Sequence, residues 1–216
     1  DVAFREQQNL EKLAEQGSDI NGLATGFYEF DKLTAGLQPS QFIIIAARPA
    51  MGKTAFILNI ATNAAINSDK AVAVFNLEMS AEQLANRILQ SQGQINGNKM
   101  RTGKLEHNDW KRLNEAISKL SDANLYLDDT PGITVGEIRS KCRRLANSDK
   151  GLGLVVIDYL QLVSGPLNSA GSRQQEVSDI SRSLKTMALE LGVPVIAAAQ
   201  LSRAVESRED KRPIMS

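Results

Sequence analysis

A glycine, a lysine and a threonine follow one another in a short segment between two apolar stretches. Gly52 would let the backbone pass close to a phosphate, and N–H groups at the start of the following helix would point at that anion. Lys53 would place its positive charge on the β- and γ-phosphates, and the hydroxyl of Thr54 would ligate Mg²⁺. These residue types indicate a phosphate-binding loop for a nucleoside triphosphate. The candidate loop residues are Ala47, Arg48, Pro49, Ala50, Met51, Gly52, Lys53 and Thr54.

One residue departs from the usual loop pattern, because Ala47 stands where the first glycine is expected. The flanking sequence nevertheless favours the loop, since 42–46 is an apolar, strand-like run and 55–60 is helix-like. The alternative is an ordinary strand-to-helix turn with a chance Gly-Lys-Thr. Because strand, loop and helix follow in the order that the motif requires, the sequence predicts that the chain binds ATP or a related triphosphate with Mg²⁺.

Two carboxylates stand at the ends of apolar runs. Asp158 follows the run 154–157, and in nucleotide hydrolases such an aspartate holds the hydration shell of Mg²⁺. Glu78 follows the run 71–77 and is predicted to orient and deprotonate an attacking water. The alternatives are a simple strand terminus for Asp158 and a first-turn acid that stabilises the next helix for Glu78. We favour the metal and catalytic roles because both acids accompany a phosphate loop.

A glutamine ends the last apolar run of the chain. Gln200 would contact the γ-phosphate or the attacking water and relay the nucleotide state to the segment that follows, where Arg203 is a further candidate nucleotide-binding residue. The competing interpretation is a buried amide that satisfies the end of a strand, and the sequence leaves the two open. The candidate catalytic residues are thus Glu78, Lys53 and Gln200.

Apolar runs and helix-like stretches alternate along the chain and predict an α/β fold. The strand-like runs contain no regular polar alternation, which is typical of a mainly parallel sheet covered by helices on both faces. The pairs Ser80 with Gln83 and Thr134 with Glu137 have the spacing of capping boxes. Expected strands are 42–47, 71–77, 125–127, 154–157 and 193–199, and expected helices are about 54–66, 80–91, 107–120, 134–147 and 173–191.

Composition bounds the class of protein. The formal net charge of the 216 residues is zero, so no overall field favours nucleic acid. The single cysteine, Cys142, fits a reducing, cytoplasmic compartment as a surface or packing thiol, and the single histidine, His107, argues against a histidine-based metal site or triad. No apolar run approaches membrane-spanning length. We expect the chain to be a fragment of a longer protein.

The first sixteen residues carry scattered apolar positions among polar ones and predict a short amphipathic helix. Two placements remain open for it: a surface of another subunit, or its own domain.

Seven segments together resemble the ATPase domain of the bacterial replicative DNA helicase, the DnaB family. They follow in the order and spacing of that family over residues 21–216: 25–31, 47–54, 76–80, 101–105, 157–162, 173–177 and 199–203. The resemblance implies a RecA-like fold for 21–216, preceded by a linker helix within 1–20 that docks on a neighbouring subunit. It also implies a homohexameric ring that encircles single-stranded DNA, moves 5′→3′ with ATP, and works with a helicase loader and a primase.

The resemblance assigns roles to matching positions of this chain. Lys53, Thr54 and Asp158 would bind MgATP, Glu78 would activate water, and Gln200 would sense the γ-phosphate. Family elements that complete the neighbour's ATP site are expected beyond Ser216, so residues 1–216 alone are predicted to bind ATP and hydrolyse it slowly.

Two other functions share the same motifs: a recombination or repair ATPase of the same fold, and a nucleotide switch that binds without hydrolysis. Basic side chains that would face DNA or a neighbour are sought among Lys141, Arg143, Arg144, Arg173, Arg182 and Lys185, most of which we expect to lie on solvated helix faces.

Overall fold

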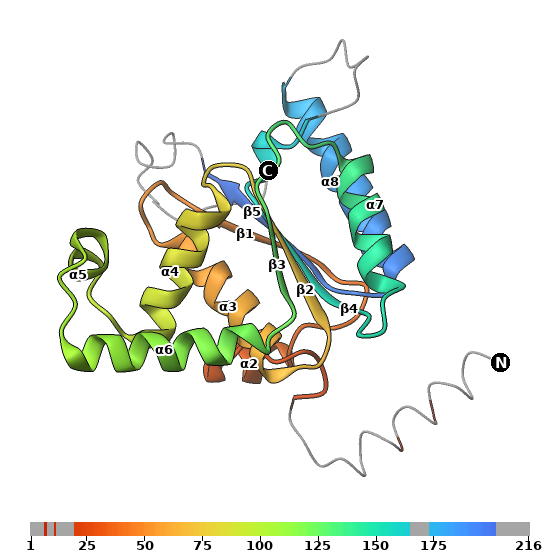
Figure 1. The fold of residues 1–216 in the computed structure, drawn as a ribbon. Coiled ribbons are helices and arrows are strands. Elements are labelled where there is room, and N and C mark those ends of the chain that lie inside the picture. Colours follow the sequence, from red (N-terminus) through yellow and green to blue (C-terminus); the bar gives the residue numbers. More distant parts are fainter. Residues whose placement is uncertain (1–6, 8–10, 12–19, 165–172, 202–216) are drawn as a thin grey trace, which may run out of the picture.

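The computed structural model describes residues 20–164 and 173–201, together with Gln7 and Glu11. Within this part of the chain five strands form a single parallel sheet in the order β1-β5-β4-β2-β3 (Figure 1). The strands are β1 (Phe42–Ala47), β2 (Ala71–Asn76), β3 (Leu125–Asp128), β4 (Leu152–Asp158) and β5 (Val195–Gln200). The helices are α2 (Tyr28–Thr34), α3 (Lys53–Asn67), α4 (Ala81–Gly93), α5 (Gly97–Thr102), α6 (His107–Ser121), α7 (Val135–Ala146) and α8 (Arg173–Leu191), with a 3₁₀ turn, η1 (Leu160–Leu162).

The two faces of the sheet belong to two separate apolar cores. Successive side chains of a strand point to opposite faces, so Val155 and Ile157 of β4 join α7 and α8 in one core, while Leu154 and Val156 join α3 in the other. Figure 1 shows α7 and α8 on one side of the sheet and α3 and α4 on the other. All residues of β2 and β4 are buried, which explains why these runs lack polar alternation.

Coverage of the sheet is incomplete at its two edges. Ile44 of β1 is 52% exposed and Tyr126 of β3 is 47% exposed. Ile44 lies on the same face as Phe42, and Tyr126 is paired with Ala73, so both face the side of α7 and α8. The expectation of helices on both faces is therefore confirmed, although α7 and α8 leave Ile44 of β1 and Tyr126 of β3 partly exposed.

Both predicted capping boxes are present. The Ser80 hydroxyl accepts from the Gln83 N–H at 3.3 Å and Thr134 accepts from the Glu137 N–H at 3.3 Å, with the reciprocal side-chain bonds also formed. These caps begin α4 and α7, the helices that follow β2 and β3. Each of the ten expected strands and helices is found, with ends that differ by at most two residues.

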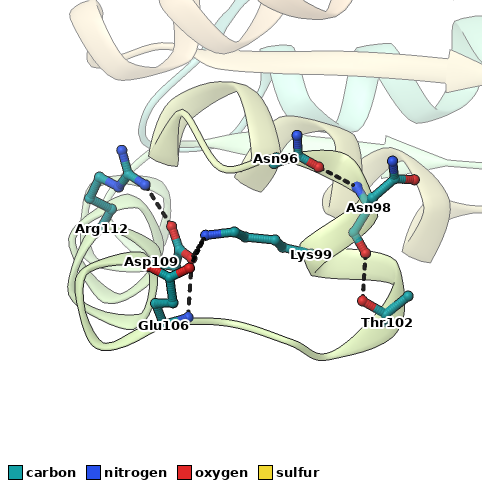
Figure 2. A network of polar contacts seen from close by, with 7 residues as sticks. All are labelled: Asn96, Asn98, Lys99, Thr102, Glu106, Asp109 and Arg112. Atoms are coloured by element: carbon teal, nitrogen blue, oxygen red, sulfur yellow. Dashed lines mark hydrogen bonds and ion pairs between the residues drawn. The ribbon is translucent and has the colours of Figure 1, made fainter.

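Two short helices, α2 and α5, are absent from the sequence-based prediction. They contain seven and six residues, too few to show a helical period against their surroundings. Helix α5 is held by polar contacts, because the Asn96 side chain caps its start and Lys99 donates to the Glu106 and Asp109 carboxylates (Figure 2). Arg112 binds the second oxygen of Asp109, so the same network fastens α5 to the start of α6.

The single cysteine lies inside the fold. Cys142 of α7 is fully buried in the core beneath α8, and burial raises the pKa of its thiol to about 12. It is therefore a packing residue, one of the two places expected for it. The predicted N-terminal helix lies almost wholly outside the described residues. Among the described helices, none is both long and apolar enough to cross a bilayer.

Candidate nucleotide-binding site

The chemistry-bearing residues predicted from the sequence converge where the parallel strands end. In the register of the sheet Asn76 of β2 stands beside Asp158 of β4, and Ala47 of β1 stands beside Gln200 of β5. Because the strands are parallel, all these carboxyl ends lie at one edge of the sheet, where α/β folds bind ligands. Segments separated by more than a hundred residues thus form one site.

The phosphate loop joins β1 directly to α3. Gly52 stands at the N-cap of α3 with φ +84°, and Ala50 has φ +62°, so two positions of the loop are in the left-handed region. Ala47, which replaces the usual first glycine, belongs to the extended strand β1, where an alanine is readily accommodated. The departure from the pattern therefore leaves the strand–loop–helix arrangement intact.

A pocket of about 350 Å³ lies over this loop. Its volume is in the range of small-molecule sites. The loop forms one wall, and Glu78, Arg87 and Gln200 approach from the turn before α4, from α4 itself and from β5. The lining residues are Ala47, Arg48, Pro49, Ala50, Gly52, Lys53, Thr54, Ala55, Glu78, Met79, Arg87 and Gln200.

Asp158 lies behind the loop and connects it to the sheet. Its Oδ2 accepts from the Thr54 hydroxyl at 2.7 Å, and its Oδ1 is 3.3 Å from the Lys53 ammonium. Although Asp158 is fully buried, its Oδ1 accepts no hydrogen bond from the described residues, because Lys53 approaches at that distance without hydrogen-bonding geometry. A buried carboxylate oxygen with unused acceptor capacity beside a threonine hydroxyl suits Mg²⁺, which prefers hard oxygen ligands and shares its shell with phosphates.

The Lys53 ammonium lies between a carboxylate and an aromatic ring. Its ammonium is paired with Asp158 on one side and lies 4.6 Å from the centre of the Tyr159 ring on the other. The side chain is 11% exposed, so the charge is partly withdrawn from water. This arrangement holds the ammonium group at the pocket wall, where it can form an ion pair with a phosphate.

Glu78 occupies the turn between β2 and α4 and is exposed at the pocket. It lines the pocket together with the phosphate loop, where a carboxylate can meet a water that attacks a bound phosphate. The competing interpretation is an acid in the first turn of the next helix. Glu78 instead stands two residues before the Ser80 cap, outside the helical turn itself. The catalytic role stays a prediction, and the lining position supports it.

Gln200 ends β5 and is exposed at the same pocket. The alternative of a buried amide that satisfies the strand end is therefore wrong for this residue. The side chain that satisfies the end of the strand is that of Gln161. It donates to the Gln200 carbonyl at 3.3 Å and accepts from the Gln200 N–H at 3.4 Å. These bonds clamp the backbone of Gln200. Its contact with the γ-phosphate stays a prediction.

Two residues of the site were not singled out from the sequence. Arg87 of α4 brings a guanidinium to the pocket wall, and Asn76 connects Asp158 to the Glu78 turn. The only signal for Asn76 is a polar residue at the end of an apolar run, and Arg87 had none, since it lies mid-helix among other polar residues.

Two residues that the sequence predicted to bind the nucleotide are not found at the pocket in the described part of the chain. Met51 does not line the pocket and is 63% exposed, so its part in ATP binding stays a prediction. Arg203 lies outside the described residues.

Most of the candidate basic residues are engaged within the chain. Lys141 binds Asp128, Arg143 binds Glu190 of α8, and Arg182 binds Asp179 at 2.9 Å. Lys185 donates to the Ser40 carbonyl at 3.0 Å, and Arg144 is exposed. The side chain of Arg173 is outside the described part. No interface for DNA follows from these positions.

Comparison with known proteins identifies the family. Residues 22–216 match the family model of the DnaB-like helicase C-terminal domain. The chain belongs to this DnaB-like family. The resemblance inferred from the seven segments is thus confirmed. The RecA-like fold is confirmed as well, since solved structures of this kind superpose on the whole chain.

Curated DnaB relatives are similar over the whole chain. The replicative DNA helicase DnaC of Bacillus subtilis (strain 168) is 55% identical over 216 residues, which are all of this chain and 47% of that protein. The replicative DNA helicase DnaB of Geobacillus stearothermophilus is also 55% identical, with the same coverage. The chain therefore spans about half the length of these curated relatives.

Two solved structures share the fold closely. One is an ATPase domain with a TM-score of 0.92 and 39% identity, and the match covers all of this chain and 76% of that one. The other is a DnaB-like replicative helicase, studied with its interactions with primase. It has a TM-score of 0.89 and 39% identity, and the match covers all of this chain and 52% of that one.

Proposed function

We propose that the chain is the ATP-driven motor domain of a replicative DNA helicase. One arrangement carries the proposal: Thr54, Lys53 and the partly unsatisfied Asp158 lie together at the phosphate loop, and Glu78 lines the same pocket. Such a site suits a magnesium-bound triphosphate at the loop and a water beside its terminal phosphate. Family membership supplies the link from ATP hydrolysis to DNA unwinding.

The residues divide the hydrolysis between them. Lys53 binds the β- and γ-phosphates, and Thr54 and Asp158 would hold a magnesium ion, which would neutralise charge on the phosphates. Glu78 accepts a proton from water as the water oxygen bonds to the γ-phosphorus. The bond from that phosphorus to the bridging oxygen then breaks and yields ADP and phosphate. Gln200 contacts the γ-phosphate and passes its loss to the segment after β5.

Ring assembly belongs to the same proposal. Glu78, Gln200 and Arg87 are all exposed at the pocket, so a neighbouring subunit can cover them and complete the site. An arginine supplied by a neighbour raises turnover by roughly 10³–10⁵ in nucleotide hydrolases, so an isolated subunit is expected to bind ATP and hydrolyse it slowly. From the family we further propose a homohexamer that moves 5′→3′ on single-stranded DNA. A helicase loader and a primase are its proposed protein partners.

The linker within 1–20 is proposed to dock on a neighbouring subunit. Its sequence is amphipathic, and an apolar cleft of about 320 Å³ between α4, α6 and β3 offers a matching surface. The cleft is lined by Ala85, Ile88, Leu89, Ile117, Leu120, Ser121, Leu125 and Leu127.

The deciding experiment compares wild type and Glu78→Gln in the full-length protein. ATP turnover is measured with and without single-stranded DNA, binding of a fluorescent MgATP analogue is measured in parallel, and strand displacement is followed on a fork with a 5′ tail. We expect DNA to stimulate wild-type turnover and the substitution to reduce turnover about 10²–10⁴-fold while sparing binding. Glu82→Gln is the matched control, since Glu82 of α4 is an exposed glutamate that does not line the pocket.

Each alternative function predicts a different outcome. A recombination ATPase would hydrolyse ATP on DNA without processive strand displacement, and a nucleotide switch would bind MgATP tightly without DNA-stimulated turnover. Either result would overturn the helicase proposal.

A further inference from the structure

The polar side chain at the end of β2 bonds both to the metal-binding carboxylate and to the turn of the proposed catalytic glutamate. Asn76 is fully buried and stands beside Asp158 in the sheet. Its amide nitrogen donates to Asp158 Oδ2 at 3.3 Å. Its amide oxygen accepts from the N–H groups of Glu78 at 3.0 Å and Met79 at 2.7 Å.

The orientation of this amide is determined by its surroundings. Two backbone N–H groups can only donate, so the side-chain oxygen of Asn76 must face Glu78 and Met79. The nitrogen must then face Asp158, which as a carboxylate only accepts. All of the contacts match donor to acceptor, and exchanging the oxygen and nitrogen would place like groups together on both sides.

The turn that carries Glu78 depends on this side chain for its shape. Leu77, the first residue of the turn, donates its N–H to the Asp158 carbonyl at 2.8 Å, and the next two N–H groups both go to Asn76. Three successive backbone donors are thus anchored on Asp158 and its strand neighbour. After them the Ser80 cap begins α4, so Glu78 lies between two fixed points.

We propose that Asn76 is a positioning residue for ATP hydrolysis. It holds the Glu78 turn in the geometry that presents the carboxylate to the attacking water, and it ties that turn to Asp158 on the metal side. This inference rests on the proposed function, in which Glu78 activates water. A general base must lie within hydrogen-bond reach of the proton that it abstracts. A small displacement of the base therefore lowers the rate without weakening substrate binding.

Asp158 Oδ2 is shared between the two halves of the site. It accepts from Thr54 on the phosphate loop and from Asn76 on the Glu78 side. A change in the charge or bonding of Asp158 therefore acts on both the loop and the catalytic turn. Asn76 is the side chain that connects this carboxylate to the Glu78 turn, alongside the backbone bond from Leu77 to the Asp158 carbonyl.

The test uses single and double variants in the full-length protein. Asn76→Ala removes both contacts, and Asn76→Ser keeps a hydroxyl that can accept from an N–H two or three residues on, as in an ST turn. We expect Asn76→Ala to lower kcat about 10–100-fold with the affinity for a fluorescent MgATP analogue within about 3-fold of wild type. Asn76→Ser should retain most of kcat, because the turn keeps an acceptor.

A double-mutant cycle separates positioning from a general loss of structure. If Asn76 acts through Glu78, then adding Asn76→Ala to Glu78→Gln should change the residual turnover by less than about 2-fold. Asn63→Ala is the matched control, since the side chain of Asn63 in α3 also bonds to backbone, donating to the Thr25 carbonyl at 3.0 Å away from the pocket. It should leave kcat unchanged in both backgrounds.

The outcomes that contradict the inference are distinct from those that contradict the proposed function. Equal losses of kcat in Asn76→Ala and Asn76→Ser, or an equal fall in wild-type and Glu78→Gln backgrounds, would show a structural role only. Wild-type turnover in Asn76→Ala would also overturn it. Normal turnover in Glu78→Gln alone would instead remove Glu78 from catalysis and with it the proposed mechanism.

Discussion

Two buried aspartates, Asp109 and Asp158, each paired with a lysine, show how a structural network differs from the one proposed to bind the nucleotide. At the start of α6, Asp109 accepts from Lys99 at 2.9 Å, Arg112 at 2.6 Å and the Glu106 N–H at 3.1 Å (Figure 2). Both of its oxygens are bonded. Hydrogen bonds from Lys99 first, then from Glu106 and Arg112, lower the pKa of Asp109 to about 2. The network closes on itself and fixes α5 to α6.

Asp158 is more deeply buried, yet its bonding is incomplete. Within the described part of the chain Oδ2 has two donors, but Oδ1 has only the Lys53 ammonium at 3.3 Å, without a hydrogen bond. A buried polar atom without a hydrogen bond is uncommon in folded proteins and calls for an explanation, which the proposed Mg²⁺ site supplies for Asp158. The comparison sets a complete network, which fastens two helices together, against an incomplete one, which we propose Mg²⁺ completes.

The largest expected effect in this comparison is a loss of ATP turnover when Asp158 is changed. Asp158→Asn removes the charge that is proposed to hold Mg²⁺ and that pairs with Lys53, so turnover of MgATP should fall about 100-fold or more. The melting temperature should change little, because Thr54 and Asn76 still find a partner in the new amide and Lys53 can turn toward the pocket. Turnover and thermal unfolding of the full-length protein test both points. A large loss of stability would show that Asp158 is a structural anchor like Asp109.

The next effect falls on stability alone. Asp109→Asn, the same chemical change in the other network, removes the negative charge that faces Lys99 and Arg112, and we expect the melting temperature to fall by about 5 °C. ATP turnover below the transition should stay within about 2-fold of wild type, since the network does not line the pocket. Calorimetry measures the melting temperature, and steady-state kinetics measure the ATP turnover. If Asp109→Asn lowers kcat as Asp158→Asn does, the division into structural and functional networks fails.

The smallest effect is a pH dependence of the Asp109 network. Its pKa of about 2 in the fold lies below the ordinary value of 3.8, so its contribution to stability is fully present above about pH 4 and is lost as the pH falls toward 2. The difference in urea midpoint between wild type and Asp109→Asn should therefore stay constant from neutral pH to about pH 5 and shrink below about pH 4. Other carboxylates titrate in both proteins and cancel in the difference. A difference that is unchanged at about pH 3 would contradict this assignment.

Sequence reasoning located the phosphate loop because Gly52, Lys53 and Thr54 are adjacent and carry their own context of strand and helix. It also found the long strands and helices, whose periodicity repeats over enough residues to be recognised. It missed α2 and α5 because seven and six residues show no period. It left Gln200 undecided, because the strand end is satisfied by Gln161, which lies 39 residues earlier and takes the structural part.

By itself the sequence determined the α/β alternation, the caps of α4 and α7, and the residue types able to bind a magnesium-bound triphosphate. These features depend on neighbours a few residues apart. Only the tertiary structure decided which polar atoms meet, because Asp158 is 104 residues from Thr54 and 82 from Asn76, and the parallel register brings them together. The incomplete bonding of Asp158 Oδ1 and the bridge from Asn76 to Glu78 exist only in that register, since a hydrogen bond depends on distance and direction in space.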